Sequence, residues 1–356
     1  MNKTITFRIM KKMIQYGLLV VSFGLSVCAY GQGSPSKDVE TTGKFTISNP
    51  FEFDLVFDIK SFIKNKDEEE YLPAKISYRL PDGTQVEKNC HVRPRGNYRK
   101  NKCYLPPIKI DFDDTAYLIP EFENMGKIKM VSLCKQAGNF EQYLIKEYLM
   151  YKAYELLSEY SFKTYFLKVN FIDTDDKKKP FSSYSFLIED IDDLAERNNA
   201  IEVENAGLLP VHLERSVMNQ LGVFQFMMGN TDWHVPNLHN LKLLKINDPD
   251  MPVPIPVPYD FDYSGIVGTN YAVPHESLPI NSITERYYMG NCMTEEEFME
   301  VKQNFMDHKD EIISLFADCS LLQGFNNKMA KSYLEDFYTI LENDRLVKQW
   351  MFERCD

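Results

Sequence analysis

The chain has 356 residues and a net charge of −12, and 44% of its residues are hydrophobic. This composition is typical of a globular protein with a sizeable core, and the length favours two lobes. Nucleic-acid binding by general charge attraction is excluded, because a phosphate backbone requires a basic surface. The chain also has no evident basic helix that would bind an anionic membrane.

The N-terminal residues are typical of an export signal. Lys11 and Lys12 precede an apolar run that ends in small residues, and this run is short for a membrane-spanning helix. We therefore predict a signal peptide over residues 1–31, a polar linker over 32–48, and an extracytoplasmic protein that is periplasmic or secreted. A retained membrane anchor and a lipid on Cys28 stay open as alternatives. No later run approaches a membrane span, so none is expected after the signal is removed.

Residues 49–190 are predicted to form a β-rich half that contains one helix. Alternating apolar and polar residues, separated by turn signals, indicate strands. Apolar residues at helical spacing, directly after Gly138 and Asn139, indicate the helix. The predicted strands cover residues 52–59, 74–80, 84–92, 106–113, 127–134, 163–172 and 182–190, and the helix covers residues 140–160.

Residues 191–356 are predicted to be mainly helical. The strongest helix covers residues 212–228, and a β-hairpin and two amphipathic helices follow it. Proline occupies every second position from Pro252 to Pro258, which excludes a central strand. We interpret this segment as an extended edge that holds Asp260 in place, and a simple spacer is the alternative. The hairpin pairs residues 238–246 with 253–262, and the last helices cover 294–319 and 326–352.

Two short loops carry the chemistry that the sequence suggests. Gly229–Asn237 reads GNTDWHVPN, and its Asp232 and Asn237 have the D-x-x-x-x-N spacing of a phosphotransfer loop. In such a loop the aspartate accepts the proton of the attacking hydroxyl, and the asparagine supplies an oxygen to magnesium. Pro256–Gly265 reads PVPYDFDYSG, and Asp260 would supply a carboxylate to the same cation. We therefore predict that the two loops form one metal–phosphate site.

These two loops resemble those of the spore-coat-protein-H (CotH) kinase-like family and, more distantly, those of HipA-type and other atypical kinases. Val92–Lys100, VRPRGNYRK, and Phe186–Asp192, FLIEDID, also match the family's RGN turn and its strand that ends in an acid. The resemblance covers residues 50–290 approximately. It implies an α+β, bilobal protein-kinase-like fold, with a mainly β N-lobe over residues 49–190 and a mainly α C-lobe over residues 191–356.

The resemblance also implies transfer of phosphate from ATP, with Mg²⁺ or Mn²⁺, to a protein or another hydroxyl acceptor. Carried over residue by residue, Asp232 would be the catalytic base. Asn237 and Asp260 would hold the metal, and Asp262 would be a further metal ligand.

A nucleotide-binding set in the first half of the chain is implied in the same way. The RGN turn would cover the phosphates, and the strand that ends in an acid would border the adenine. A lysine paired with a glutamate would bind the α- and β-phosphates, although no motif fixes which lysine this is. The set is Arg95, Gly96 and Asn97 in the turn, Lys109 and Lys129 as candidate lysines, Glu147 as the helical partner, and Glu189 beside the adenine.

Other functions stay open at this point. Related folds also transfer AMP, and a non-catalytic binding or assembly module is a further alternative. The presence of Asp232, Asn237 and Asp260 together argues against that module, since a non-catalytic protein would be free to lose them. A zinc or iron site built from His234, His239 and Asp232 lacks a standard ligand spacing.

Six cysteines follow the predicted signal, and an even count permits disulfides in an exported chain. Cys90 and Cys103 flank a turn-rich stretch and form the favoured pair. The alternative is that all six are reduced and buried. No C-x-x-C motif is present, which argues against a zinc knuckle.

Overall fold

The computed structural model describes residues 46–68, 70–80, 82–96, 98–113, 126–136 and 138–353. The predicted signal peptide, most of the predicted linker and Cys28 lie outside these residues. Thr42–Asp356 forms one compact unit, and the predicted boundary at residue 190 stays a prediction. Among the residues described, we find no helix with the length and apolar character needed to cross a membrane.

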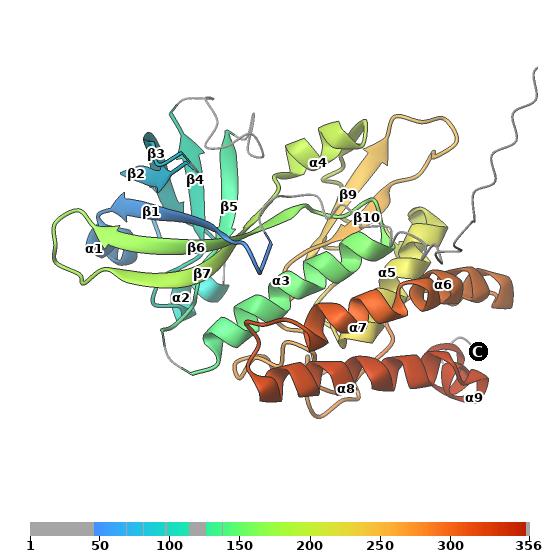
Figure 1. Ribbon diagram of the computed structural model, residues 1–356. Helices are drawn as coiled ribbons and strands as arrows, with labels where there is room; N and C mark the ends of the chain where they lie inside the picture. The colour runs from blue at the N-terminus through green and yellow to red at the C-terminus, as the bar shows by residue number, and fades with distance from the viewer. Residues whose placement is uncertain are drawn as a thin grey trace, which may run out of the picture. The chain divides into compact units, whose positions relative to one another are not determined.

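Seven strands form a closed barrel in the order β1-β2-β3-β4-β5-β7-β6 (Figure 1). Neighbouring strands are antiparallel, except that β1 pairs in parallel with β6 and so closes the barrel. The strands are β1 Phe51–Phe57, β2 Leu72–Arg79, β3 Gln85–Pro94, β4 Ile108–Phe112, β5 Lys127–Val131, β6 Thr164–Asp173 and β7 Phe181–Ile188. They confirm all seven strands that the sequence pattern predicts in this half of the chain.

The inward faces of the strands fill the barrel with apolar side chains. Along β1, Phe51, Phe53, Leu55 and Phe57 are buried and alternate with more exposed residues, as the period of two in a strand requires. They belong to one core cluster with residues from the other barrel strands. A barrel packed in this way is a rigid support for the loops at its ends.

The predicted bilobal protein-kinase-like fold is wrong. The β-rich half closes into a barrel, and the half predicted to be mainly α contains a separate three-stranded sheet in the order β10-β9-β8. Local sequence patterns predict each strand separately. Closure of the barrel, however, depends on the pairing of β1 with β6, a strand far away in the sequence. Phe51 of β1, for example, lies opposite Leu167 of β6. No local pattern in the sequence specifies a pairing over that separation.

The three-stranded sheet confirms the predicted edge segment. Its strands are β8 Ala200–Glu202, β9 Leu241–Ile246 and β10 Ile255–Pro258. β10 pairs only with β9 in this sheet, as its prolines require. Ile255 and Val257 are fully buried, and helix α5 packs against the strand.

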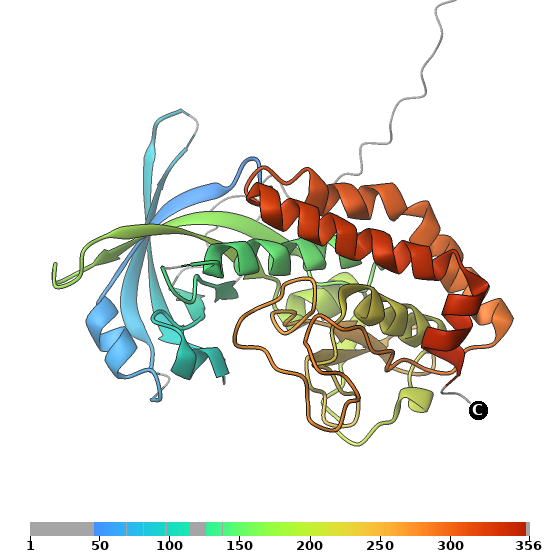
Figure 2. The same cartoon turned by 90° about the horizontal axis from the view of Figure 1, so that it is seen from below.

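Helix α3, Phe140–Leu157, connects the barrel to the C-terminal helices. It contacts β6 and β7 of the barrel and also α7, so it is enclosed on several sides (Figures 1 and 2). Most of its residues are buried, including Lys146 and Glu147. A helix that is covered all round can place a charged side chain in the interior, provided that the charge finds a partner.

The remaining helices include three short ones that the sequence pattern does not reveal. These are α1, α2 and α4, and α2 lies where only a basic turn is predicted. The predicted helix over 294–319 is divided at His308 into α6 and α7. The bounds are α1 Ile59–Lys64, α2 Tyr98–Lys102, α4 Ile191–Arg197, α5 Arg215–Met228, α6 Glu295–Asp307, α7 Lys309–Ala317, α8 Gly324–Leu341 and α9 Asp344–Val347, with a 3₁₀ turn at Pro210–His212 and a π turn at Lys348–Phe352.

The predicted disulfide between Cys90 and Cys103 is wrong. Cys103 is bonded to Cys134, with Cα atoms 4.4 Å apart. Cys90 is a free thiol, 1% exposed, in the barrel core. The turn-rich stretch does carry one of the bonded cysteines, but the short helix α2 directs Cys103 toward the segment that follows β5.

Candidate functional site

Two predicted loops lie side by side at the C-terminal end of α5. The amide of Gly265 donates to the carbonyl oxygen of Gly229 at 3.0 Å, and the amide of Ile266 donates to that of Met228 at 3.1 Å. Gly229 has a φ of 64°, and a Cβ there would lie 1.9 Å from the Tyr333 hydroxyl. Glycine is therefore required at this position, where the helix ends and the first loop begins.

Asp232 is held in the first loop by hydrogen bonds from both sides. His239 Nε2 lies 2.8 Å from Asp232 Oδ1, and Asn240 Nδ2 donates to Asp232 Oδ2 at 3.0 Å. The backbone amide of Asp232 donates to Asn230 Oδ1. A third of the Asp232 side chain is exposed, so the carboxylate is oriented and still accessible. This is the arrangement expected of a general base.

Asn237 lies at the exposed end of the same loop. His234 and His239 pair through reciprocal backbone hydrogen bonds, so the residues between them form a tight turn. The Asn237 amide oxygen contacts the His234 ring at 2.9 Å and accepts from the His239 amide. The structure therefore brings Asn237 to the histidines, and its role as a metal ligand stays a prediction.

Asn240, which the sequence analysis did not select, connects the two loops. It is 8% exposed, and its side-chain amide nitrogen binds both Asp232 Oδ2 and the Asp232 carbonyl oxygen. Its own carbonyl oxygen accepts from the amide of Tyr259 at 3.1 Å. The residue type itself could have drawn attention to Asn240. Its φ is 54°, and asparagine is one of the few residues that readily adopt a positive φ.

Asp260 follows the edge strand β10 and has a φ of 60°. Its amide donates to the Tyr151 hydroxyl at 2.9 Å. No hydrogen bond or ion pair to its carboxylate is found among the residues described. Burial, and then the charge of Asp262, raise its pKa to about 6, and the charge of Asp232 adds to this effect. The charge of Asp232 therefore reaches Asp260, and the joint role of these two aspartates in one metal–phosphate site stays a prediction.

Asp262 and Glu147 are joined by Arg99, an arginine of the basic segment Val92–Lys100. Arg99 Nε donates to Asp262 Oδ2 at 2.8 Å, and Arg99 Nη2 donates to Glu147 Oε2 at 2.5 Å. The Tyr271 hydroxyl also donates to Asp262 Oδ2. Although burial opposes it, the charges of Asp262 and Glu147 hold the pKa of Arg99 well above its usual value.

A cavity of about 70 Å³ lies among these groups. Its lining includes the acidic residues Glu147, Asp260 and Asp262 and the basic residues Arg95 and Arg99. Apart from Gly96, the other lining residues are apolar or aromatic, namely Pro107, Val131, Tyr151, Ile188, Tyr259 and Tyr263. A lining that combines charged with apolar groups suits a ligand that combines a flat apolar ring with charged groups.

The predicted RGN turn contributes Arg95 and Gly96 to this cavity, whereas Asn97 lies outside the described residues. Burial lowers the pKa of Arg95, and the charge of Asp260 opposes that shift. Within the described part of the chain, the Arg95 guanidinium makes no hydrogen bond or ion pair. A buried cation in this state is available to bind an anion.

Neither candidate lysine forms the expected ion pair with Glu147. Lys129 Nζ lies 3.2 Å from Asp190 Oδ2, and burial lowers the pKa of Lys129 while Asp190 opposes the shift. Lys109 is the cross-strand neighbour of Lys129. Arg99 occupies the place beside Glu147 that the sequence analysis assigned to a lysine. Both lysines keep their assigned role only as a prediction.

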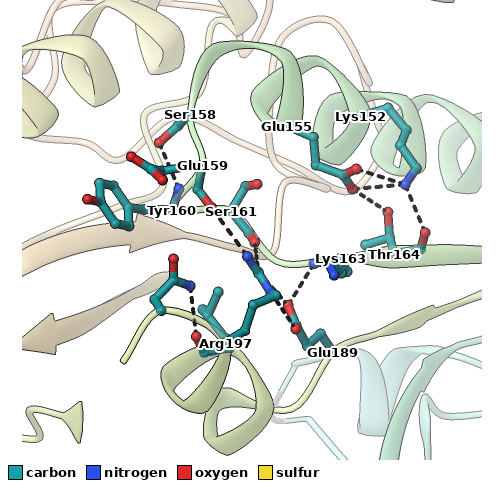
Figure 3. A network of polar contacts seen from close by, with 12 residues as sticks. Lys152, Glu155, Ser158, Glu159, Tyr160, Ser161, Lys163, Thr164, Glu189 and Arg197 are labelled. Carbon is teal, nitrogen blue, oxygen red and sulfur yellow. Dashed lines mark hydrogen bonds and ion pairs between the residues drawn. The ribbon is translucent and has the colours of Figure 1, made fainter. Parts of the chain in front are cut away.

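Glu189 lies at the end of β7 and is bound by Arg197 of helix α4 (Figure 3). Arg197 Nη2 donates to Glu189 Oε2 at 2.9 Å and to the carbonyl oxygen of Ser161 at 2.7 Å. The amide of Lys163 also donates to Glu189 Oε2. The carboxylate of Glu189 is 4% exposed, and these contacts fix the connection between α3 and β6 to the end of β7.

Replacing Arg197 by methionine is therefore expected to lower the free energy of unfolding by roughly 2–3 kcal/mol, because a buried carboxylate loses its charged partner. Urea unfolding would measure the change. Lys168→Met is the matched control, because the Lys168–Glu52 pair is exposed on both sides, and the expected loss is about 0–1 kcal/mol. Equal losses in the two variants would contradict the structural role of Arg197.

No model of a known protein family matches the chain, and no curated protein matches it either. In the part of the chain that the structure describes, no group of three or more His, Cys, Asp or Glu side chains is arranged to bind a metal ion. The geometry of the cavity itself therefore has to indicate the function.

The cavity contains one more carboxylate than guanidinium group, and Glu147 responds to this excess. Burial raises the pKa of Glu147 from its usual value of 4.5 to about 8, while the charge of Arg99 opposes the shift. Glu147 Oε1 is buried and has no hydrogen-bond partner in the described residues. The folded protein thus retains a proton at Glu147 that the unfolded chain releases above pH 4.5.

A pH dependence of stability follows with a definite sign. A carboxyl that binds its proton more tightly when folded favours the folded state at low pH, and this contribution is lost as the pH rises from 4.5 to about 8. We expect the free energy of unfolding of Glu147→Gln to fall less steeply over this pH window than that of the wild type, because glutamine can still accept from Arg99 and does not ionise. Urea unfolding at several pH values would measure the slope of the free energy of unfolding against pH for both proteins. Identical slopes would contradict the raised pKa of Glu147.

Proposed function

We propose that the cavity binds a nucleoside triphosphate with a divalent cation, and that the protein transfers a phosphoryl or nucleotidyl group to a hydroxyl acceptor. The observation that carries the proposal is the pair formed by Arg95 and Asp260. Both are charged, both line the cavity, and neither the Arg95 guanidinium nor the Asp260 carboxylate has a hydrogen-bond partner among the described residues. The sequence motifs that suggested phosphotransfer support the same chemistry, and an extracytoplasmic location remains part of the proposal.

The ligand class is inferred from the two kinds of residue that line the cavity. The Arg95 guanidinium presents a fork of donors that matches phosphate oxygens. The apolar side chains of the lining, such as Val131 and Ile188, can cover a purine or pyrimidine ring. A nucleotide fits this division of polarity better than an uncharged or a purely apolar ligand.

The oxygen donors beside the cavity fit Mg²⁺ or Mn²⁺. Magnesium is commonly held by one or two carboxylates together with substrate phosphates and water, so a full protein cage is not required. Asp260 offers a carboxylate, and Asp262 Oδ1 is not used by Arg99 or Tyr271. The amide nitrogen of Asn240 points to Asp232, which leaves its oxygen available. These are hard ligands of the kind that magnesium prefers.

The chemistry divides between the cation and the chain. When bound, the divalent cation would neutralise the negative charge that develops on the phosphates. Arg95 binds phosphate oxygens, and Asp232 accepts the proton of the attacking hydroxyl. His239 and Asn240 hold the Asp232 carboxylate in one orientation.

The proposal is tested by binding and by labelling. ATP with Mn²⁺ at a hundred times its dissociation constant is expected to stabilise the full chain by about 2.7 kcal/mol, measured as a shift in thermal unfolding. Transfer of label from γ-labelled ATP would identify a phosphoryl transferase, and transfer from α-labelled ATP would identify a nucleotidyl transferase. A stabilisation that is absent, or that is equal in Asp260→Asn, would overturn the proposal.

A further inference from the structure

We propose that the disulfide between Cys103 and Cys134 controls this site by holding Arg99 between its two carboxylates. The inference rests on the proposed function, because it concerns regulation of the same cavity. Cys103 directly follows α2, and its amide donates to the carbonyl oxygen of Arg99 at 2.9 Å. One helical turn therefore connects the disulfide to Arg99.

Arg99 acts as a positioning residue. Its side chain is 14% exposed, and it bridges Glu147, which is 2% exposed, and Asp262, which is 8% exposed. These two carboxylates come from α3 and from the loop after β10, so Arg99 links two separate walls of the cavity. Without Arg99, Asp262 would lose its charged partner, and its charge would repel that of Asp260 more strongly. The geometry offered to a cation would then change.

Helix α2 depends on external contacts for its position. It has five residues, and a helix of that length is not stable alone. The disulfide connects its C-terminal end to the segment after β5, where the amide of Tyr104 also donates to the carbonyl oxygen of Cys134. Val131, the last residue of β5, lines the same cavity as Arg99. The bond therefore ties two walls of the site together covalently.

The disulfide is accessible to a reductant. A second cavity, of about 80 Å³, is lined by both cysteines together with Arg99, Lys102 and Lys135. Cys103 is 7% exposed, and Cys134 is more exposed. Nearby cationic side chains stabilise a departing thiolate and so favour exchange.

Reduction proceeds by ordinary thiol–disulfide exchange with a dithiol. A thiolate of the dithiol attacks the sulfur of Cys134, the S–S bond breaks, and Cys103 leaves as a thiolate that takes up a proton. The second thiol of the reductant then attacks the mixed disulfide and releases Cys134. The protein gains two electrons and two protons, and the dithiol becomes a cyclic disulfide.

The experiment compares the full oxidised chain with the chain reduced by dithiothreitol. Hydrogen exchange is expected to increase over residues 98–105 while the barrel strands stay protected. The affinity for ATP with Mn²⁺ is expected to fall about tenfold or more, the usual effect of losing a group that orients metal ligands. The double variant Cys103→Ser/Cys134→Ser should show the same hydrogen exchange and the same nucleotide affinity as the reduced protein. Addition of dithiothreitol should change neither of them. Cys292→Ser, which removes a different disulfide, should respond as the wild type does.

Unchanged hydrogen exchange over residues 98–105 after complete reduction would overturn the proposed control of the site by the disulfide. A general loss of protection in the barrel strands would also overturn it, because the disulfide would then stabilise the fold alone. Faster exchange with unchanged affinity would also overturn it. If the oxidised chain fails to bind the nucleotide, the proposed function fails, and exchange over residues 98–105 still decides whether the disulfide positions Arg99.

Discussion

Replacing Asp260 by asparagine is expected to lower kcat/KM for the proposed transfer by about a thousandfold. The charge of a bound divalent cation contributes several kcal/mol to a phosphoryl transition state, and about 4 kcal/mol corresponds to this factor. Asp260 presents a carboxylate to the cavity without a hydrogen-bond partner among the described residues, so its charge is available to the cation. Steady-state kinetics with ATP and Mn²⁺ would measure the loss.

Asparagine is the appropriate substitution because Asp260 has a φ of 60°. Asparagine tolerates this backbone conformation, whereas alanine would add strain unrelated to metal binding. Asp192→Asn is a matched control, because Asp192 is an exposed aspartate on helix α4, outside the cavity. Activity of Asp260→Asn within a few-fold of that control would remove Asp260 from the metal site.

The elements of the barrel could be predicted from the sequence because each strand carries its own signal. Alternating burial along β1 and the apolar run of β7 are local properties of the chain. Barrel closure is not local, since β1 pairs with a strand far away in the sequence, with Phe51 opposite Leu167. The fold prediction failed at that point, although the individual strands were correct.

The contact between the two acidic loops was also predictable, because each loop follows an element with a clear signal. Helix α5 ends at a glycine, and β10 ends with prolines, so both deliver their acids at defined places. The pairing of Arg99 with Glu147 was not predicted for a different reason. Helix α2, which carries Arg99, has only five residues, which is too short for a periodic pattern, and no lysine motif indicated that an arginine would pair with Glu147.

Asn237 and Asn240 illustrate the limit of spacing as a guide. The D-x-x-x-x-N pattern selects Asn237, but the turn between His234 and His239 carries that residue to the exposed end of the loop. Positive φ values at Leu238 and Asn240 return the chain toward Asp232. Spacing along the chain cannot reveal this reversal, because it depends on backbone conformation at two positions.

Asn240→Gly is therefore expected to lower kcat about a hundredfold, close to the effect of Asp232→Asn, which removes the proposed base itself. Asn240 donates to both the carboxylate and the carbonyl of Asp232, so its loss frees the Asp232 carboxylate to rotate. Glycine keeps the positive φ without strain, which separates the side-chain effect from a backbone effect. Asn237→Gly is the matched control, and we expect it to retain kcat within a few-fold.

Single-turnover rates with a saturating nucleotide would compare the three variants without interference from product release. If Asn240 orients the base, the double variant Asp232→Asn/Asn240→Gly should be no slower than Asp232→Asn alone, since a positioning residue has no effect once its target is gone. A further hundredfold loss in the double variant would mean that Asn240 acts independently of Asp232, as a metal ligand. A large loss in Asn237→Gly with normal rates in Asn240→Gly would restore the assignment that the spacing suggested.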